Sequence, residues 1–130
     1  MSNEINTRNA KIWKTKEGIV KVVYRPGTEE TLEDAETNLS ALQEFSRGER
    51  LPVFINPNSQ KSMSRDARLY YIKNTRQIAS AVAVLRTSPF SHILSIFLLV
   101  LNKTMNNNLF SLRFFTSEDM AMDWLKNYKA

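Results

Sequence analysis

The run Ala81-Val82-Ala83-Val84-Leu85 constrains the fold of this chain more than any other segment. It is apolar without polar alternation, which is typical of a strand that is buried on both of its faces. Such a strand lies inside a sheet that helices cover. The run therefore predicts an α/β domain.

Strand-like and helix-like segments alternate along the rest of the chain. The predicted strands lie at 10–14, 19–24, 52–57, 81–85 and 109–115. The predicted helices lie at 31–45, 64–78, 88–103 and 116–128. The order is ββαβαβαβα, in which an initial hairpin precedes strands joined by right-handed crossovers. We expect one mixed five-stranded sheet with four helices packed against it.

Three of the predicted helices begin at a residue that can cap them. Thr31 precedes the first helix, with Asp34 three residues later as in a capping box. Ser64 precedes the second helix. Thr116 is the predicted cap of the last helix, whose buried stripe consists of Ala121, Trp124, Leu125 and Tyr128.

Length and composition are those of one domain spanning residues 1–130. Hydrophobic residues make up 42% of the chain, enough for a core without metal or disulfides, and there is no cysteine. Residues 1–7 show no signal-peptide pattern and are expected to be a loosely ordered N-terminus. The longest apolar run, Ile96–Leu101, is far shorter than the roughly 20 residues of a membrane span. We expect a soluble cytoplasmic protein.

Charge is unevenly distributed along the chain. Residues 28–46 hold six acidic residues and no basic one, namely Glu29, Glu30, Glu33, Asp34, Glu36 and Glu44. Residues 50–76 hold six basic residues against Asp66 alone. This asymmetry would suit an anionic partner, but solvated helix faces of opposite sign are the favoured interpretation.

The chain resembles the STAS / SpoIIAA-like family, and more narrowly an uncharacterised bacterial subgroup of that fold. The resemblance lies in the order of segments over nearly the whole chain: Ala10–Trp13 with Gly18-Ile19, Pro52–Ile55, Ala67-Arg68, Ala81–Leu85, Asn102-Lys103, and Leu109–Phe115 through Thr116 to Trp124-Leu125. STAS-type domains are non-enzymatic and bind partner proteins, and some respond to phosphorylation or nucleotides. The resemblance therefore implies a non-enzymatic regulatory or protein-interaction domain.

One segment departs from that family. Its anti-anti-sigma branch carries a regulatory serine in an Asp-Ser-Ser-Gly-like turn before the second helix, where this chain reads Ser62-Met63-Ser64-Arg65-Asp66-Ala67. The glycine is missing and the local charge is basic. Ser64 is therefore interpreted first as a helix cap, and Ser62 and Ser64 are only weak phosphoacceptor candidates.

The second helix supplies the main candidate interaction surface. Arg65, Leu69, Ile72 and Arg76 share one face, which Arg68 flanks. Apolar residues among arginines are typical of a protein-binding patch, although Leu69 or Ile72 could instead pack under a neighbouring loop. The same basic helix is the candidate site for an anionic ligand, either a nucleotide or a nucleic acid. Nucleic acid is disfavoured because no known binding motif is present.

The third helix is apolar almost all round. Leu94 and Leu98 point away from its expected sheet-facing side, so they are candidates for a homodimer contact. A plain core helix is the alternative. An apolar or lipid ligand beside this helix is a further hypothesis.

No pattern in the chain predicts catalysis or a cofactor. His92 is the single histidine, and neither phosphate-binding glycine motif occurs. The carboxylates are expected to be cap-side or solvent-exposed acids. We therefore expect no enzyme activity, no metal and no cofactor, and an unidentified protein partner with self-association.

Overall fold

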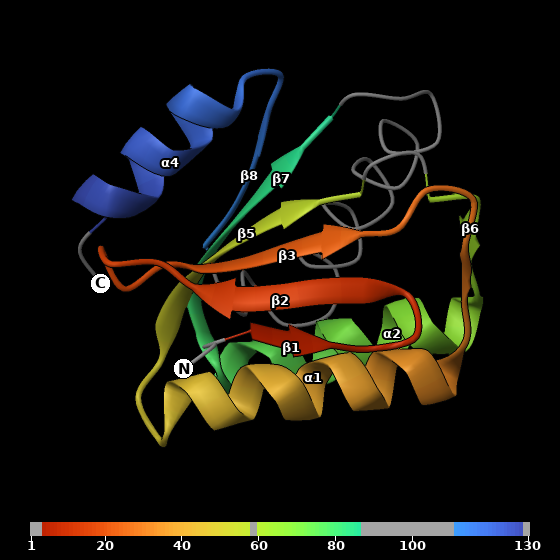
Figure 1. Cartoon of the computed structure of the whole chain (residues 1–130). Helices are drawn as coiled ribbons and strands as arrows, with labels where there is room; N and C mark the ends of the chain where they lie inside the picture. The colour runs from red at the N-terminus through yellow and green to blue at the C-terminus, as the bar shows by residue number, and fades with distance from the viewer. Residues whose placement is uncertain (1–3, 58–59, 87–110, 129–130) are drawn as a thin grey trace.

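A mixed sheet of six strands organises the fold (Figure 1). The computed structural model describes residues 4–57, 60–86 and 111–128. The strands follow the spatial order β1 (Glu4–Asn6), β2 (Ala10–Lys14), β3 (Val20–Tyr24), β5 (Leu51–Asn56), β7 (Ala79–Leu85) and β8 (Ser111–Phe115). The first three strands pair antiparallel, and the pairs from β3 to β8 are parallel.

The strand and helix counts differ from the sequence prediction. The sixth strand is β1, formed by residues that were expected to be loosely ordered. It pairs with β2, and Ile5 lies opposite Ile12. The helices in the described part of the chain are α1 (Leu32–Ser46), α2 (Arg65–Asn74) and α4 (Glu118–Asn127), and a 3₁₀ turn, Thr75–Gln77, follows α2. The helix predicted at 88–103 lies outside the described residues.

Helices pack on both faces of the sheet, as the run at 81–85 predicted (Figure 1). Val82 and Val84 face the layer formed by α1 and α2, where Leu39 and Leu42 of α1 join the same core cluster. Ala81 and Ala83 face α4 on the other side, in a cluster with Ala121 and Leu125. All the side chains of β7 except Ser80 are buried, which explains why the run lacks polar alternation.

The helix caps agree with the sequence prediction at two positions of three. The Thr31 side chain accepts a hydrogen bond from the Asp34 backbone N–H, and the Asp34 side chain accepts one from the Thr31 N–H, which is a capping box. Ser64 caps α2 by accepting from the Ala67 N–H. The prediction was wrong for α4, which Ser117 caps in place of Thr116 by accepting from the Met120 N–H.

A second, two-stranded sheet ties the starts of α1 and α2 together. β4 (Glu29–Glu30) and β6 (Ser62–Met63) pair in parallel, immediately before the two helix caps. The Ser64 N–H donates to the Glu30 carbonyl at 2.9 Å, and the Lys61 N–H donates to the Thr28 carbonyl at 2.8 Å. This pairing turns the Glu30 side chain inward and the Glu29 side chain outward.

The helices in the described part of the chain are short relative to a bilayer. None of those in residues 4–57, 60–86 and 111–128 is long and apolar enough to cross a membrane.

Candidate functional site

Glu30 is a carboxylate enclosed in the interior between α1, α2 and the sheet. Its side chain belongs to a residue that is only 1% exposed. Its oxygen Oε1 accepts from Gln60 Nε2 at 3.0 Å. Its oxygen Oε2 accepts from the Tyr71 hydroxyl and from Asn38 Nδ2 at 3.1 Å, with the Tyr24 hydroxyl 3.5 Å away. Four neutral donors therefore surround one buried acid, which is how a protein holds a charge without a counterion.

These contacts fix the orientation of two buried amides. The Gln60 amide nitrogen donates to Glu30 Oε1 and also to the Ser62 carbonyl, so a flipped amide would set its oxygen against two acceptors. The Asn38 amide nitrogen donates to Glu30 Oε2 and to Asn9 Oδ1. The outward-facing oxygens, Gln60 Oε1 and Asn38 Oδ1, have no hydrogen-bond partner in the described residues.

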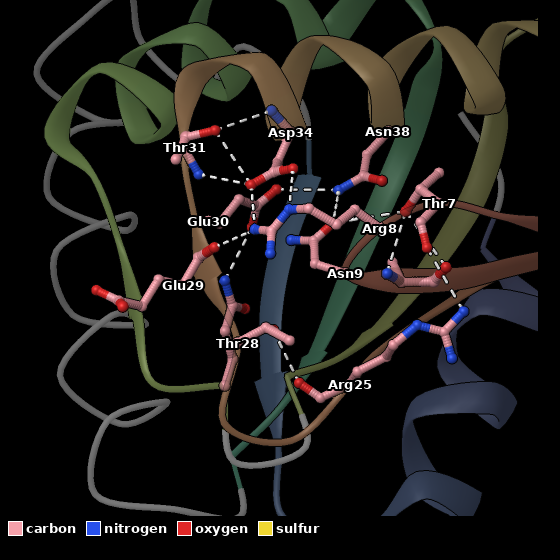
Figure 2. A network of polar contacts seen from close by, with 12 residues as sticks. Thr7, Arg8, Asn9, Arg25, Thr28, Glu29, Glu30, Thr31, Asp34 and Asn38 are labelled. Atoms are coloured by element: carbon pink, nitrogen blue, oxygen red, sulfur yellow. Dashed lines mark hydrogen bonds and ion pairs between the residues drawn. The ribbon is translucent and has the colours of Figure 1, made fainter.

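An ion pair lies beside this cluster, at the start of α1 (Figure 2). Arg8 Nε donates to Asp34 Oδ1 at 2.8 Å, and Arg8 Nη2 donates to Asp34 Oδ2 and to the Glu29 carbonyl. Asp34 also serves the capping box, so one carboxylate joins the segment before β2 to the beginning of α1. The Arg8 hydrogen bonds, with help from those of Thr31, lower the pKa of Asp34 to about 2.

The low pKa of Asp34 predicts an acid-sensitive contribution to stability. The ionised side chain stabilises the fold above its unfolded pKa of about 3.9, and this contribution is lost as pH falls toward 2. Because the Arg8 side chain is 58% exposed, solvent screening reduces the contribution to about 1–2 kcal/mol. We expect the free energy of unfolding, measured in urea, to change less with pH between 2.5 and 5 in Asp34→Asn than in the wild type. Glu33→Gln, on the exposed neighbour, should leave the pH dependence of the unfolding free energy as in the wild type. The same pH dependence in Asp34→Asn would contradict the role given to Asp34.

Burial of Glu30 corrects the expectation that the acids of residues 28–46 are solvated. Burial raises the pKa of Glu30, while its hydrogen bonds with Tyr71, Gln60 and Asn38 act in the opposite direction. Burial also raises the pKa of the Tyr24 and Tyr71 hydroxyls well above 10, so both remain protonated donors. Tyr24 was the one sign of this buried cluster in the sequence. It continues the alternation of inward-facing residues Val20 and Val22, and a buried tyrosine hydroxyl needs a hydrogen-bond partner.

A cavity of about 70 Å³ lies next to this cluster, between α2 and the sheet. The sheet supplies apolar walls from β5, β7 and β8, and α2 supplies Tyr71 and Ile72. The described lining consists of Tyr24, Ile55, Pro57, Gln60, Met63, Tyr71, Ile72, Thr75, Val82, Val84 and Leu112. Apolar atoms therefore form almost all of the cavity surface, although Gln60, Thr75 and the two tyrosines are among the lining residues.

A smaller void of about 30 Å³ adjoins the same tyrosines. It is lined by Tyr24 and Tyr71 together with Asn38, and its other walls are apolar side chains of the sheet and α1. Both oxygens without a partner therefore belong to residues that line a void: Gln60 lines the larger cavity and Asn38 the smaller one. Concave, mostly apolar walls of this kind are typical of a small-molecule site.

A second depression, of about 470 Å³, lies between β1 and the end of α1. Its charged lining carries both signs, with Glu4 and Glu44 beside Lys14 and Arg47. No buried polar atom without a partner belongs to its described lining. It is a surface groove that selects no single ligand chemistry, so the cavity beside Glu30 is the stronger candidate.

The surface predicted on α2 is only partly present. Arg65 and Arg76 are exposed, and Leu69 is half-buried. Arg68 is half-buried and donates to the Met63 carbonyl. The prediction was wrong for Ile72, which is buried because it faces the sheet and lines the cavity. The core side of α2 thus includes Ile72 as well as the expected Ala67.

The other predicted site residues have separate locations. Ser62 lies in β6 rather than in a loop, with its hydroxyl 3.5 Å from Glu29 Oε1, and Ser64 is the cap of α2. Leu94, Leu98 and His92 lie outside the described residues. In the described segments, no group of three His, Cys, Asp or Glu side chains could hold a metal ion.

A comparison with solved structures bears on the fold. The crystal structure of an uncharacterized DUF3478-family protein from Shewanella loihica PV-4, which has a SpoIIAA-like fold, superimposes with a TM-score of 0.61 at 18% identity, over 96% of this chain and 98% of that one. The predicted SpoIIAA-like fold is therefore confirmed. No curated protein matches the sequence. The family model that describes DUF7793, a domain of unknown function, matches residues 12–129, and the chain belongs to this family.

Proposed function

We propose that this domain is a non-enzymatic regulatory module that binds a small apolar molecule in the cavity between α2 and the sheet. The observation that carries the proposal is the cavity itself, whose walls are almost entirely apolar. Close-packed interiors contain few voids larger than a water molecule. A void of this size beside a polar cluster is therefore a feature that needs a function.

The chemistry of the cluster favours binding over catalysis. Both Glu30 oxygens accept hydrogen bonds from neutral side chains, and Gln60, Asn38 and the two tyrosines surround the acid. A general base needs a free lone pair within reach of a substrate proton. Glu30 instead holds its neighbours in place, and it is not among the described residues that line the cavity.

The helix that lines the cavity also offers an outer surface to a partner. Tyr71 and Ile72 lie on the inner side of α2, whereas Arg65 and Lys73 on the same helix and Arg76 in the turn after it are exposed. A shift of α2 on ligand binding would move these cations together. We propose that these cations contact an acidic surface of a partner protein. Ligand binding in the cavity would then change the affinity for that partner. Self-association and binding of an anionic ligand remain predictions.

Filling the cavity with a larger side chain tests the proposal. Val84 is buried and lines the cavity, and Val84→Phe adds a ring where the void lies. We expect the variant to fold with a free energy of unfolding within about 1.5 kcal/mol of wild type, because the ring occupies existing space. We also expect it to lose binding of furan, a five-atom apolar ring, in a titration followed by amide chemical shifts.

The matched control is Val23→Phe, on a half-buried β3 residue that does not line the cavity. It should bind furan as wild type does. Wild-type protein that shows no furan-dependent shifts at Ile72 and Val84 would overturn the proposal. So would equal furan binding by folded Val84→Phe.

A further inference from the structure

The most exposed large hydrophobic residue in the described part of the chain lies on α4. Met120 is 63% exposed, whereas core residues of the same helix, Ala121 and Leu125, are buried. Trp124 follows Met120 one turn later on the same side of the helix and is half-buried. Met120 and Trp124 therefore form an apolar stripe along α4, beside its core side.

A cation from the edge strand β8 lies against this stripe. The Arg113 guanidinium carbon is 5.5 Å from the centre of the Phe115 ring and 5.9 Å from the centre of the Trp124 ring. Both distances are those of cation–π contacts, and an arginine held over aromatic rings can still donate its N–H groups to a carboxylate. Arg113 is exposed and forms no ion pair with residues 4–57, 60–86 or 111–128. It is therefore a positioned donor for a carboxylate of another molecule.

Two acids lie on the other side of the stripe. Successive residues of a helix are about 100° apart, so Leu125, Trp124 and Asp123 face the core, β8 and solvent in turn. Residues 119–121 repeat this order one turn earlier. Asp119 and Asp123 are both exposed, and neither belongs to an ion pair of the described segments. Both carboxylates are therefore available to a cation of another molecule.

The order of charges makes this surface self-complementary. From β8 outward it presents a cation, an apolar stripe and two acids. In a two-fold contact between identical chains, the same surface of each copy meets the other in the reverse direction. An axis through the stripe near Met120 would place Arg113 of each copy against the acids of the other, with apolar side chains between them. We call this the α4 surface; it consists of Arg113, Asp119, Met120, Asp123 and Trp124.

We infer that the α4 surface binds a second copy of the same chain with two-fold symmetry. The two signs of charge favour this partner, since a wholly acidic partner would meet Asp119 and Asp123 as like charges and a wholly basic one would meet Arg113 so. Met, Trp and Arg are also residue types that interfaces favour. A helix of 10 residues is only about 15 Å long, so the contact is small and we expect a weak, reversible dimer. This contact does not depend on the ligand cavity.

Charge reversal tests the two-fold arrangement in the full chain. We expect sedimentation equilibrium to show wild-type dimers at protein concentrations up to about 1 mM. Arg113→Glu and Asp123→Arg should each weaken association at least about 10-fold, because each places like charges together on both sides of the axis. An equimolar mixture of the two variants should associate as the wild type does. In the mixed dimer, the new acid of one copy faces the new base of the other, and the two native charges face each other.

The matched control is Lys61→Glu, which makes the same change of charge on an exposed residue immediately before β6. That strand lies across the molecule from α4 (Figure 1), so this variant should associate as the wild type does. Thermal unfolding checks that every variant is folded. If Arg113→Glu does not fold, Met120→Lys on the exposed stripe takes its place, and it should also weaken association at least about 10-fold.

Three results would overturn the inference. The first is wild-type protein that remains monomeric up to about 1 mM. The second is unchanged association of folded Arg113→Glu, Asp123→Arg or Met120→Lys, which would show that the copies meet through another surface. The third is a mixture of Arg113→Glu and Asp123→Arg that associates no better than either variant alone, because the two charges would then not face each other across the axis.

Discussion

Replacing Glu30 by leucine is expected to lower the free energy of unfolding by about 3–5 kcal/mol, which is a large part of the stability of a domain of this size. The substitution fills similar space but removes the acceptor of the Tyr71 hydroxyl and one of the acceptors of the Asn38 and Gln60 amide nitrogens, all of which are buried. Urea unfolding at pH 7, followed by far-UV circular dichroism, measures the loss.

Two controls separate the hydrogen bonds from the charge. Glu30→Gln keeps one acceptor oxygen for Tyr71 and Asn38 and loses the hydrogen bond from Gln60, which still donates to the Ser62 carbonyl, so we expect a loss of only about 1 kcal/mol. Glu29→Leu changes the exposed neighbour and should have almost no effect. A Glu30→Leu variant as stable as wild type would show that the buried cluster contributes nothing to folding.

The raised pKa of Glu30 also predicts how the stability of the wild type changes with pH. A folded-state pKa above the unfolded value means that the ionised acid is less favourable in the fold, so wild-type stability falls as pH rises from the unfolded pKa of about 4.3 through the folded pKa. Glu30→Gln should remove that decline. The effect is opposite in sign to the contribution of Asp34.

Phe54→Ala is expected to destabilise the domain by about 3–5 kcal/mol through loss of packing on the other face of the sheet. The Phe54 ring is 0% exposed and belongs to the core cluster that holds α4. Lys21 Nζ lies 5.5 Å from the centre of the ring and 2.7 Å from Glu118 Oε2, so the ring also supports an ion pair between β3 and α4.

Hydrogen exchange shows which part of the structure Phe54→Ala destabilises. We expect the amides of Ala121 and Leu125 to lose protection in Phe54→Ala, because α4 contacts the sheet through the cluster around this ring. Phe54→Leu, which retains most of the apolar volume, should cost roughly 1–1.5 kcal/mol. Phe114→Ala, on a half-buried residue of the opposite core, should leave the protection of α4 intact. Equal protection of α4 in Phe54→Ala would contradict the assignment.

The parts of the fold predictable from sequence are those with a strong local signal. The run Ala81–Leu85 is apolar because both faces of β7 are covered, and Thr31 and Ser64 are followed by the residues that complete their caps. β1 was missed because three residues with only Ile5 apolar carry too little periodicity to predict a strand. Its pairing with β2 is a tertiary effect.

The candidate site was not predictable because its members are distant in the chain. Glu30, Asn38, Gln60 and Tyr71 come from β4, α1, the segment before β6 and α2. A polar residue in a sequence is expected at the surface, and only the assembled fold shows that the other three residues donate hydrogen bonds to Glu30. The same reason explains Ile72, since helical spacing defines the faces of α2 but does not say which face meets the sheet.

The short strand β1 has a consequence for how the protein behaves in solution. A sheet edge presents unpaired backbone groups, and proteins avoid aggregation by making edge strands short and polar. β1 does this with three residues, two of which are Glu4 and Asn6. Trimming the chain to residue 7 would expose the five-residue strand β2, with Trp13 beside the new edge. We therefore expect the residues that look most dispensable in the sequence to protect this edge of the sheet from pairing with another chain.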